Sequence, residues 1–565
     1  MKEHILKYVL KNALDFQGKA NSKVVLGQVL KEHEELKKDV PKLLKEIEQV
    51  IKEVEAMPSE KIKEKLEKEF PKLLKEKKEE RVEGALKPLA NAQKGKVVTR
   101  IAPSPSGPLH IGHAYGASLN YEYAKMYDGK LLLRIEDTNP ENIYPDAYRL
   151  IEEDVKWLSD NHVAEVIIQS SRLEIYYSYA EELVKKGKAY VCTCDADQWR
   201  LLKAEGTACP CRELPVEGQH ARYKKMLKGY AEGEAVLRLK TDITDKNPAM
   251  RDFSLMRVNE HVHPRTGTKY RVWPLMIFSV AIDDYESGVT HVLNGKDHAD
   301  NAKKEAMIMK CLGWKAPEYS HWGRINFQGM KISTSETRLK IEHKEYTGWD
   351  DIRLPFLPAL RKRGYQAGAF RKFAAEIGLS LNDKTVAPEE FWKIVNACNK
   401  DIVESQADRY FFVDNPIRIT VQDAPKKEVM IDLHPDFPKR GKRKLLVHGE
   451  FLISENDFRT LGEGYMHRLM DYGNFRLKGE TFHYVSESYD EYKNASNKGK
   501  IIHWLPPKNN VPVEIMMEDG SLSKGFGEET LRGVKEGGII QFERRFFVRV
   551  DKSSKKGMTC WFLHR

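Results

Sequence analysis

The hydrophobic pattern is clearest in one stretch of the chain, where it predicts a strand, a tight turn, a helix and a second strand. Lys96 to Ile101 is rich in β-branched residues, which favour strands. Serine, proline and glycine crowd the segment from Ser104 to Pro108, which predicts a turn. Apolar residues recur at helical spacing from Ile111, and Gly129 is expected to end this helix in the left-handed conformation. Lys130 to Glu136 is a second apolar strand, and the unit is typical of half of a nucleotide-binding α/β domain.

Helical and strand patterns alternate further along the chain. The apolar run that contains Pro274 leads into acidic and glycine turns, which fits the second half of the same nucleotide-binding fold. The expected helices are Leu150 to Leu158 and Ser171 to Lys186, the latter ended by Gly187; the expected strands are Val163 to Ile168, Glu234 to Lys240 and Ser254 to Val258, followed by a buried strand and helix in Tyr270 to Ile282.

Residues 1 to about 92 are rich in lysine and glutamate and have helical periodicity. Apolar residues recur at helical spacing from Leu43 to Val54, just after Pro41, which suits a first helical turn. Ser59 is expected to cap a further helix, Glu60 to Phe70. We predict a small charged helical bundle with solvated faces, and a role in gripping RNA or a partner protein is the alternative.

The pattern changes after Val413 to short alternating runs that glycine, asparagine, proline and aspartate separate, which predicts β-barrels. The basic segment Lys439 to Lys444 lies among these runs. It is either a solvated charge run or, on a barrel face, a contact for phosphates and unstacked bases. The runs are Ile417 to Val421, Lys444 to Leu452, Gly479 to Val485 and Ile539 to Val550.

A chain of 565 residues is too long for one hydrophobic core. It carries 94 lysines and arginines against 84 aspartates and glutamates, and this net charge of +10 permits a basic face for nucleic acid without requiring one. The longest apolar run, Val272 to Ile282, is too short to span a membrane, and the N-terminus lacks a signal-peptide core. Seven cysteines do not indicate a disulfide framework at this length. We therefore expect a cytoplasmic protein of several domains without a membrane partner.

Candidate chemistry begins where the first α/β helix starts, at His110-Ile111-Gly112-His113. Two imidazoles one turn apart flank a glycine, so that a flat base can approach the backbone while the imidazoles face a phosphoryl group. The helix N-terminal amides and the two rings would then stabilise charge that develops on an α-phosphate. A solvated histidine pair or a pair of metal ligands is the alternative, which the surrounding P-S-P-S-G-P-L sequence disfavours.

Four of the cysteines form two close pairs, Cys192 with Cys194 and Cys209 with Cys211. Such pairs can close a tetrahedral thiolate site for zinc, and reducing cytosol would keep the thiols free for it. Most zinc ribbons use C-x-x-C pairs instead, so buried or loop thiols are the alternative. With four thiolates and no spare ligand position, the metal would be structural rather than catalytic.

The string R-I-A-P-S-P-S-G-P-L-H-I-G-H from Arg100 to His113, with L-R-I-E-D-T-N-P after it, resembles the signature of class I aminoacyl-tRNA synthetases, in particular the glutamyl/glutaminyl branch and its archaeal glutamyl members. Gly329 to Ser335 (G-M-K-I-S-T-S) resembles the K-M-S-K-S loop of that class. Trp349 to Gly364 resembles another segment of the branch, and its basic patch Arg361 to Arg363 would touch the inner bend of the tRNA. The predicted barrels support the archaeal type, because bacterial glutamyl enzymes use helices there.

The resemblance implies ATP-dependent formation of glutamyl-adenylate from glutamate, followed by transfer to the 2′-hydroxyl of the terminal ribose of tRNA(Glu), with tRNA(Gln) as a second candidate. It implies Mg²⁺ with ATP, a structural zinc in the insertion that handles the tRNA acceptor end, and no DNA partner. It also implies a domain order: a helical N-terminal extension (1–95), a Rossmann-like catalytic domain (96–345) with an acceptor-end insertion (about 188–260), a helical linker (346–408) and tandem β-barrels that read the anticodon (409–565).

The resemblance also implies roles for individual residues. Arg100 would bind a carboxylate of the amino acid and Glu136 its ammonium. The implied catalytic residues are His110, His113 and Lys331; the ATP-binding residues are Pro103, Ser104, Pro105, Ser106, Gly107, Pro108, Leu109, His110, Ile111, Gly112, His113, Lys331, Ser333 and Ser335; the substrate-binding residues are Arg100, Ala102, Ser104, Glu136, Met276 and Asn294; and the zinc ligands are Cys192, Cys194, Cys209 and Cys211.

Three positions depart from the pattern of the branch. Met276 stands where a tyrosine is usual, and Asn294 replaces an arginine that commonly pairs with the side-chain carboxylate of glutamate, which weakens discrimination against glutamine. Glu336 places an acid beside the phosphate clamp, which is unfavourable unless Arg338 or Lys340 compensates. Two alternatives therefore stay open: a glutaminyl-tRNA synthetase, and a tRNA-binding paralogue without activity.

Overall fold

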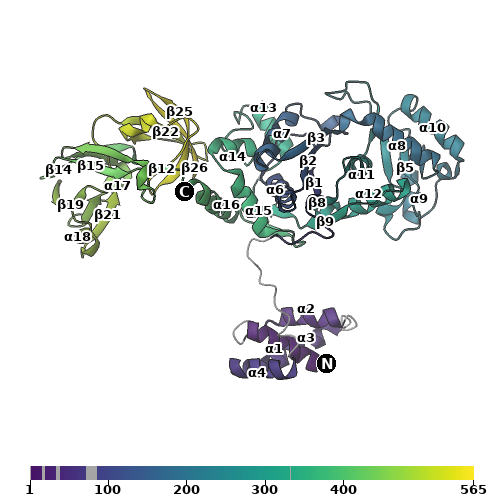
Figure 1. Ribbon diagram of the computed structural model, residues 1–565, viewed down its shortest axis with the longest axis horizontal. Helices are drawn as coiled ribbons and strands as arrows, with labels where there is room; N and C mark the ends of the chain where they lie inside the picture. The colour runs from purple at the N-terminus through teal and green to yellow at the C-terminus, as the bar shows by residue number, and fades with distance from the viewer. Residues whose placement is uncertain (1, 16–18, 34–38, 71–85, 331) are drawn as a thin grey trace. The chain divides into compact units, whose positions relative to one another are not determined.

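The computed structural model describes residues 2–15, 19–33, 39–70, 86–330 and 332–565. The chain divides into two compact units, Met1–Ala85 and Leu86–Arg565 (Figure 1). Among the described residues, no helix combines the length and the apolar character needed to cross a membrane.

The described helices of the first unit enclose a small apolar core, to which α1 contributes Ile5 and Val9, and α3 contributes Ile47. The predicted helical extension is therefore confirmed. Pro58, in an extended conformation, occupies the cap position of the helix that begins at Ser59; the prediction that Ser59 is the cap is wrong. The described helices of this unit are α1 (Lys2–Asp15), α2 (Ser22–Glu32), α3 (Val40–Glu55) and α4 (Ser59–Glu69).

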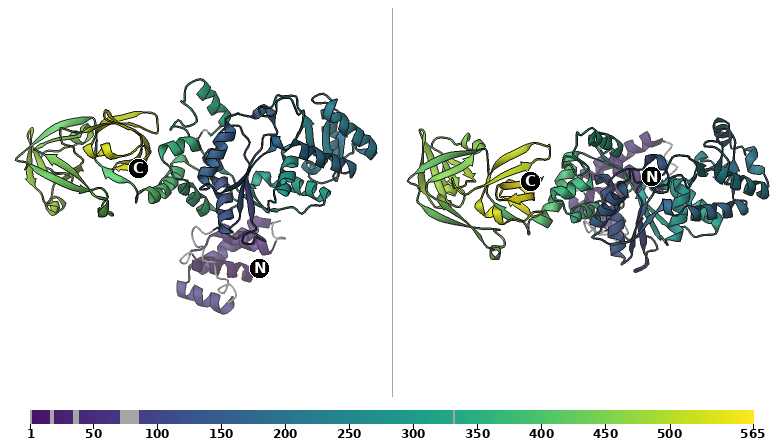
Figure 2. Two further views of the ribbon diagram at one scale, coloured as in Figure 1. Left: turned by 45° about the horizontal axis from the view of Figure 1, so that its top comes forward. Right: turned by 90° about the horizontal axis from the view of Figure 1, so that it is seen from above.

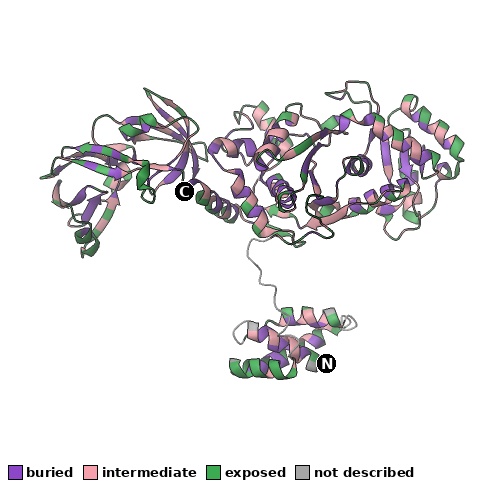
Figure 3. Cartoon of the chain, in the orientation of Figure 1, coloured by how far each residue is buried: buried purple, intermediate pink, exposed green. Residues whose placement is uncertain are grey.

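A parallel sheet lies at the centre of the second unit, and its strand β2 is the most deeply buried (Figure 3). The strands β1 (Val98–Ile101), β2 (Lys130–Ile135) and β3 (Val163–Ile168) pair in parallel in that order, and α6 (Ile111–Met126) and α7 (Ala147–Leu158) connect them. A second parallel pair, β8 (His291–Gly295) and β9 (Glu318–Trp322), joins at β1, where the Thr290 amide donates to the Val98 carbonyl oxygen at 3.1 Å. The direction of winding therefore reverses between β1 and β8, which is where open α/β sheets bind ligands.

The end of α6 differs from the prediction. Asp128, at φ +47°, is the left-handed residue that follows the helix, so the prediction that Gly129 has this role is wrong. A Cβ atom at Gly129 would lie 2.2 Å from the carbonyl oxygen of Val97. Glycine is needed here because the chain enters β2 against the backbone that leads into β1, and only a residue without a side chain allows that approach.

An antiparallel subdomain interrupts the parallel fold between β3 and β8. Its sheet has the order β4-β5-β6-β7 and packs with α8 and α10 around its own core, which includes Tyr176, Leu237 and Trp273. The strands and the helix predicted in this part of the chain are confirmed, with ends shifted by a few residues. The elements from here to the end of the fold's second half are α8 (Leu173–Lys185), β4 (Ala189–Cys192), α9 (Ala196–Glu205), α10 (Val216–Lys228), β5 (Val236–Leu239), β6 (Ser254–Val258), β7 (Val272–Pro274), α11 (Met276–Glu286) and α12 (Ala299–Leu312).

The linker helices pack on α6 and α7 and extend their core. Tyr115 of α6, for example, shares one apolar cluster with Phe370, Phe373 and Phe391. The linker elements are β10 (Ile325–Phe327), α13 (Thr334–Glu342), α14 (Leu357–Arg363), α15 (Ala367–Ile377), β11 (Lys384–Val386) and α16 (Pro388–Val403); 3₁₀ turns occur at Pro140–Asn142, Gln169–Ser171, Pro210–Glu213, Pro248–Met250, Lys296–His298, Pro438–Arg440 and Glu529–Gly533.

The C-terminal strands confirm the predicted barrels as a near-barrel and a half-barrel (Figure 2). The near-barrel sheet has the order β12-β24-β25-β26-β22-β23-β13. Only Phe411 separates β12 from β13 in sequence although they are the two edges of this sheet, so the sheet curls until its edges approach. The half-barrel sheet has the order β17-β14-β20-β19-β18-β21.

Two of the predicted C-terminal runs are each two strands. The run Lys444 to Leu452 turns at Gly449 (φ +83°), and Ile539 to Val550 turns at Arg544 (φ +56°). The bounds are β12 (Asp408–Tyr410), β13 (Phe412–Asp414), β14 (Pro416–Gln422), β15 (Lys427–Asp432), β16 (Lys442–Val447), β17 (Glu450–Ser454), α17 (Glu455–Phe458), β18 (Met466–Leu469), β19 (Gly473–Lys478), β20 (Thr481–Ser486), α18 (Tyr489–Asn494), β21 (Lys498–Ile502), β22 (Val511–Met516), β23 (Leu522–Gly527), β24 (Ile539–Phe542), β25 (Phe546–Ser554) and β26 (Gly557–His564).

The basic patch Arg361 to Arg363 is built into the protein rather than presented to solvent. Arg363 is buried and donates to the carbonyl oxygens of Phe562 and Leu563 at 3.1 and 2.7 Å. Arg361 pairs with the buried carboxylate of Asp154 at 2.9 Å. This patch therefore ties α14 to α7 and to β26. We expected the patch to contact the tRNA, but Arg363 is not available to RNA.

The basic segment Lys439 to Lys444 contains one buried residue, Arg443. The side chain of Arg443 is fully buried between the carboxylates of Glu528 and Glu543. Arg440 pairs with Asp408 at 2.8 Å. Neither of the two alternatives drawn from the sequence describes Arg443, because it is buried between acids of the near-barrel; Lys439, Arg440, Lys442 and Lys444 are exposed.

Candidate active site and metal centre

A cavity of about 760 Å³ opens where β1, β2, β8 and β9 end, beside the point at which the direction of winding reverses. It brings together residues from the turn after β1, from α6 and from segments nearly two hundred residues away in sequence. Of the residues predicted to form the site, Arg100, Ala102, Pro103, Ser104, Leu109, His110, Gly112, His113, Glu136, Met276 and Asn294 line this cavity.

The other predicted residues lie beside the cavity lining. Pro105, Ser106, Gly107, Pro108 and Ile111 belong to the turn and the helix start; Ser333 and Ser335 begin α13; Lys331 lies outside the described residues, and its neighbour Ile332 lines the cavity.

The turn after β1 contacts the start of α13. A Cβ atom at Gly107 would lie 2.3 Å from the Cγ2 atom of Thr334. The two signature segments, far apart in sequence, therefore meet at a position where only glycine leaves enough room.

The two histidines cap the helix that they begin. The Nδ1 atom of His110 accepts the Gly112 amide hydrogen at 3.0 Å, and the Nδ1 atom of His113 accepts the His110 amide hydrogen at 3.3 Å. The rings stack with centroids 3.8 Å apart. Because each Nδ1 is an acceptor, each neutral ring carries its proton on Nε2, which makes both Nε2 atoms hydrogen-bond donors.

Both histidines are neutral near pH 7. Burial, with a smaller contribution from His113, lowers the pKa of His110 to about 2. The ring of His113 is exposed to the cavity rather than packed in the core, and the surrounding protein lowers its pKa to about 4. The pair therefore presents N–H donors to the cavity without a full positive charge.

A charged network forms the floor of the cavity. Arg100 donates through Nε and Nη2 to the carboxylate of Asp284 at 3.2 and 3.3 Å. Arg134 also donates to Asp284, and to Glu136 at 3.0 Å. Burial opposes ionisation of Asp284, but the two guanidinium groups hold its pKa below the usual value. The carboxylate of Asp284 therefore fixes both arginines in place.

Sequence reasoning missed Arg134 and Asp284 as parts of the site. The signal was present, since Arg134 interrupts an apolar strand and Asp284 follows the apolar run V-A-I-D at the end of α11. Charged residues in such buried positions need partners. The identity of the partners could not be read, because Arg134 and Asp284 come from segments that only the fold brings together.

Two of the departures from the branch pattern have structural consequences. Asn294 accepts a hydrogen bond at Oδ1 from the Nδ1 atom of His321 at 2.6 Å, so its amide is held against β9. Met276, at the start of α11, is 37% exposed and contributes an apolar wall to the cavity. Glu305, which the sequence analysis did not single out, also lines the cavity.

The negative charge of Glu336, the third departure from the branch pattern, is compensated by a neighbouring lysine. Glu336 pairs with Lys340 one turn along α13 at 3.2 Å. Ser333 caps this helix, since its Oγ atom accepts the Glu336 amide hydrogen at 3.4 Å and lies 3.3 Å from the Oγ atom of Ser335. The helix therefore starts in an ordered way immediately after the signature loop.

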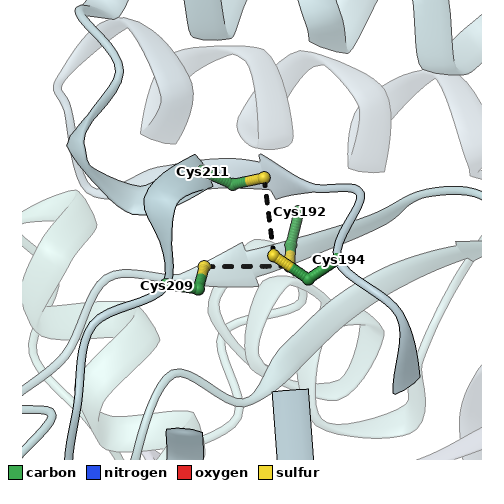
Figure 4. A group of neighbouring side chains, drawn as sticks. All are labelled: Cys192, Cys194, Cys209 and Cys211. Atoms are coloured by element: carbon green, nitrogen blue, oxygen red, sulfur yellow. Dashed lines mark hydrogen bonds between the residues drawn. The ribbon is translucent and has the colours of Figure 1, made fainter. Parts of the chain in front are cut away.

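The four clustered cysteines converge in the antiparallel subdomain (Figure 4). Their Sγ atoms all lie within 4.8 Å of one another, with 3.9 Å between Cys192 and Cys209 and 3.8 Å between Cys194 and Cys211. Four thiolates at Zn–S distances of about 2.3 Å around a tetrahedral ion would be about 3.8 Å apart. The cluster therefore has the donor set and the spacing that a structural zinc requires.

The surroundings of the cluster favour thiolates at Cys209 and Cys211 only. The hydrogen bond with Cys209 raises the pKa of Cys192, and burial raises that of Cys194 to about 11. The hydrogen bond from Cys192 lowers the pKa of Cys209 to about 5. Burial opposes ionisation of Cys211, but hydrogen bonds from Thr193 and from Arg222, whose Nη1 atom lies 3.2 Å from Sγ, lower its pKa overall.

Comparison with known proteins gives matches along nearly the whole chain. A family model described as the catalytic domain of class I tRNA synthetases (E and Q) matches residues 96–404, and two models of anticodon-binding domains of the same class match residues 407–491 and 501–551. The chain is 43% identical to a glutamate–tRNA ligase of Methanococcus maripaludis (strain C7) over 569 residues, and 43% identical to one of Methanocaldococcus jannaschii over 567 residues, with 100% of both chains covered in each case. A glutamate–tRNA ligase of Pyrococcus furiosus is 44% identical over 575 residues, covering 99% of each chain.

Proposed function

We propose how this chain, which belongs to the class I tRNA synthetases for glutamate and glutamine and has glutamate–tRNA ligase activity, divides that reaction among its residues. The observation that carries the proposal is the cavity in which the histidine pair, Arg100 and Glu136 meet. Glutamate and ATP react there, and the glutamyl group then passes from the adenylate to the terminal ribose of tRNA(Glu).

His110 and His113 act on the α-phosphate of ATP. As the α-carboxylate of glutamate attacks, a new O–P bond forms, the bond to pyrophosphate breaks, and negative charge grows on the α-phosphate oxygens. The two Nε2–H donors and the positive end of the α6 helix dipole stabilise that charge. Mg²⁺ on the ATP phosphates supplies further neutralisation. The histidines transfer no proton in this step.

The amino acid binds over the charged network. Glu136 accepts hydrogen bonds from its ammonium group. Arg100 already directs Nε and Nη2 to Asp284, so we assign its Nη1 group to a substrate carboxylate. Because Asp284 holds the guanidinium rigidly, little conformational entropy is lost when the substrate binds.

Lys331 steadies the leaving pyrophosphate. This assignment rests on its place in the signature loop directly before α13, on the lining role of Ile332 and on the packing of Thr334 against Gly107. Ser333 and Ser335 hold the loop at its helical end.

The remaining assignments concern the tRNA and the metal. The near-barrel and the half-barrel bind the anticodon end of tRNA(Glu), and tRNA(Gln) is a second candidate acceptor. Cys192, Cys194, Cys209 and Cys211 hold a zinc ion that cross-links the antiparallel subdomain next to the acceptor end. Charging of tRNA places the protein in the cytoplasm, without a membrane or DNA as a partner.

Charging of purified tRNA(Glu) and tRNA(Gln) with labelled glutamate, and separately with labelled glutamine, tests the proposal. Glutamate on both tRNAs is the expected result. Glutamate on tRNA(Glu) alone would remove tRNA(Gln) from the proposal. Charging by Glu136→Gln with an unchanged KM for glutamate would contradict the proposed amino-acid site. The control variant is His162→Gln, because His162 is exposed and lies outside the cavity.

A further inference from the structure

Glu305 is a buried acid that has no role in the proposed reaction. It lies in the middle of α12, is 4% exposed and lines the cavity that holds the histidine pair. Its Oε2 atom is buried and has no hydrogen-bond partner among the described residues. A buried polar atom without a partner is rare and costly, so its position at a cavity wall indicates a missing ligand.

The charges around Glu305 are already balanced without it. The two guanidinium groups of the network face two carboxylates, so an ionised Glu305 would add an uncompensated negative charge to the floor of the cavity. Burial, followed by the nearby carboxylate of Asp284, raises the pKa of Glu305 to about 7. The charged and titratable groups that act on it are Arg100 on β1, Arg134 on β2, Glu136 after β2, Asp284 on α11 and Tyr319 on β9.

We propose that Glu305, as an uncharged carboxylic acid, donates a hydrogen bond to the side-chain carboxylate of the glutamate substrate and thereby selects glutamate over glutamine. The proposal rests on the assignment of the amino acid to this cavity. A neutral acid can donate to a carboxylate. An ionised Glu305 would repel the carboxylate of glutamate but would accept a hydrogen bond from the amide of glutamine.

This role accounts for the loss of arginine at position 294. A guanidinium group recognises a carboxylate at any pH below about 12, whereas a neutral acid does so only while it keeps its proton. The selectivity of this protein should therefore depend on pH, which an arginine-based site would not show.

The test compares the KM for glutamate in tRNA(Glu) charging between pH 6 and pH 8 for the wild type and for Glu305→Gln. Only the protonated acid binds glutamate, so the KM of the wild type should rise about tenfold over this range. Glutamine at position 305 keeps the shape and a donor but cannot ionise, so the KM of the variant should change by less than about twofold over the same range. Parallel pH profiles in the two proteins would overturn the proposal.

A second measurement needs no variant. Glutamine, added as a competitor of glutamate, should inhibit the wild type more strongly at pH 8 than at pH 6, because ionised Glu305 accepts its amide hydrogens. Inhibition that is equal at the two pH values would contradict the proposal. The variant Glu136→Gln tests the amino-acid site independently of Glu305. If this variant has a raised KM for glutamate and the wild type is insensitive to pH, only the role of Glu305 is rejected. If the KM of this variant for glutamate is unchanged, the amino-acid site itself is rejected.

Discussion

His110 and His113 stack on each other with ring centroids 3.8 Å apart, and each ring accepts a backbone amide hydrogen through Nδ1. The arrangement is a helix cap that leaves both Nε2–H groups free to donate. A residue type that is commonly a general acid or base is used here as a neutral, fixed donor, because the capping bonds select one tautomer and the surrounding protein keeps the rings uncharged.

Substitution of either histidine should lower the charging rate without unfolding the protein. Loss of one donor to the developing phosphate charge is expected to cost about 10²–10³-fold in kcat, and loss of the cap about 1 kcal/mol of stability. His110→Asn, which can both cap the helix and donate, should retain more activity than His110→Ala. An equal loss in both variants would contradict the donor role. The measurement is steady-state charging with urea unfolding of each variant.

The pH profile gives an independent check on the same pair. Since the pKa of His110 is about 2 and that of His113 about 4, neither titrates between pH 6 and pH 8. At saturating glutamate, kcat should therefore show no inflection near pH 6.5, the ordinary value of histidine. An inflection there that disappears in His113→Asn would show that a protonated His113 takes part.

The cysteine cluster should bind about one zinc ion per chain. Cys209→Ser is expected to lose it and to increase amide hydrogen exchange in the strand β4, which contains Cys192, because the cross-link between the two pairs is broken. Cys311→Ser is the matched control, since Cys311 lies outside the cluster and is only partly buried. Metal analysis of the purified wild type tests whether zinc is bound, and a zinc content far below one ion per chain would reject the site.

Arg443 should matter for stability rather than for RNA binding. Its removal would leave Glu528 and Glu543 without their buried partner, so Arg443→Ala is expected to cost about 3–5 kcal/mol. Lys444→Ala, a neighbouring basic residue paired with Glu428 on the surface, should cost less than about 1 kcal/mol. Urea unfolding measures both, and equal effects would contradict the assignment.

His564 makes stability depend on pH. Burial is the main cause that lowers its pKa to about 4, and its Nε2 atom lies 2.9 Å from the amide of Asn399. Between pH 6.5 and about pH 4, the unfolded chain binds a proton that the folded chain does not, so stability falls as the pH falls. Relative to wild type, His564→Gln should reduce the loss of stability between pH 7 and pH 5 by about 2 kcal/mol. His162→Gln, an exposed control, should leave that loss unchanged.

Much of the local structure follows from the sequence. The strand from Val163 to Ile168 and the stop of α8 at Gly187 (φ +65°) were predicted correctly, since alternation and breakers act over a few residues. The errors at Ser59 and Gly129 share a cause. Both residue types suit a helix end, but the neighbouring Pro58 and the approach of Val97 decided the outcome.

The sequence by itself determined the order of strands and helices, the helix start at His110 and the four thiols, because each depends on spacing within a short segment. Only the tertiary structure decided which charges are partners. Arg100 and Asp284 are joined across 184 positions, and Arg443 and Glu528 across 85. The same arginine on a strand can face solvent, RNA or a buried acid, and the hydrophobic pattern does not distinguish these cases. The distinction arises only when distant segments pack and water is excluded, since burial is what makes an unpaired charge costly and so requires the partner.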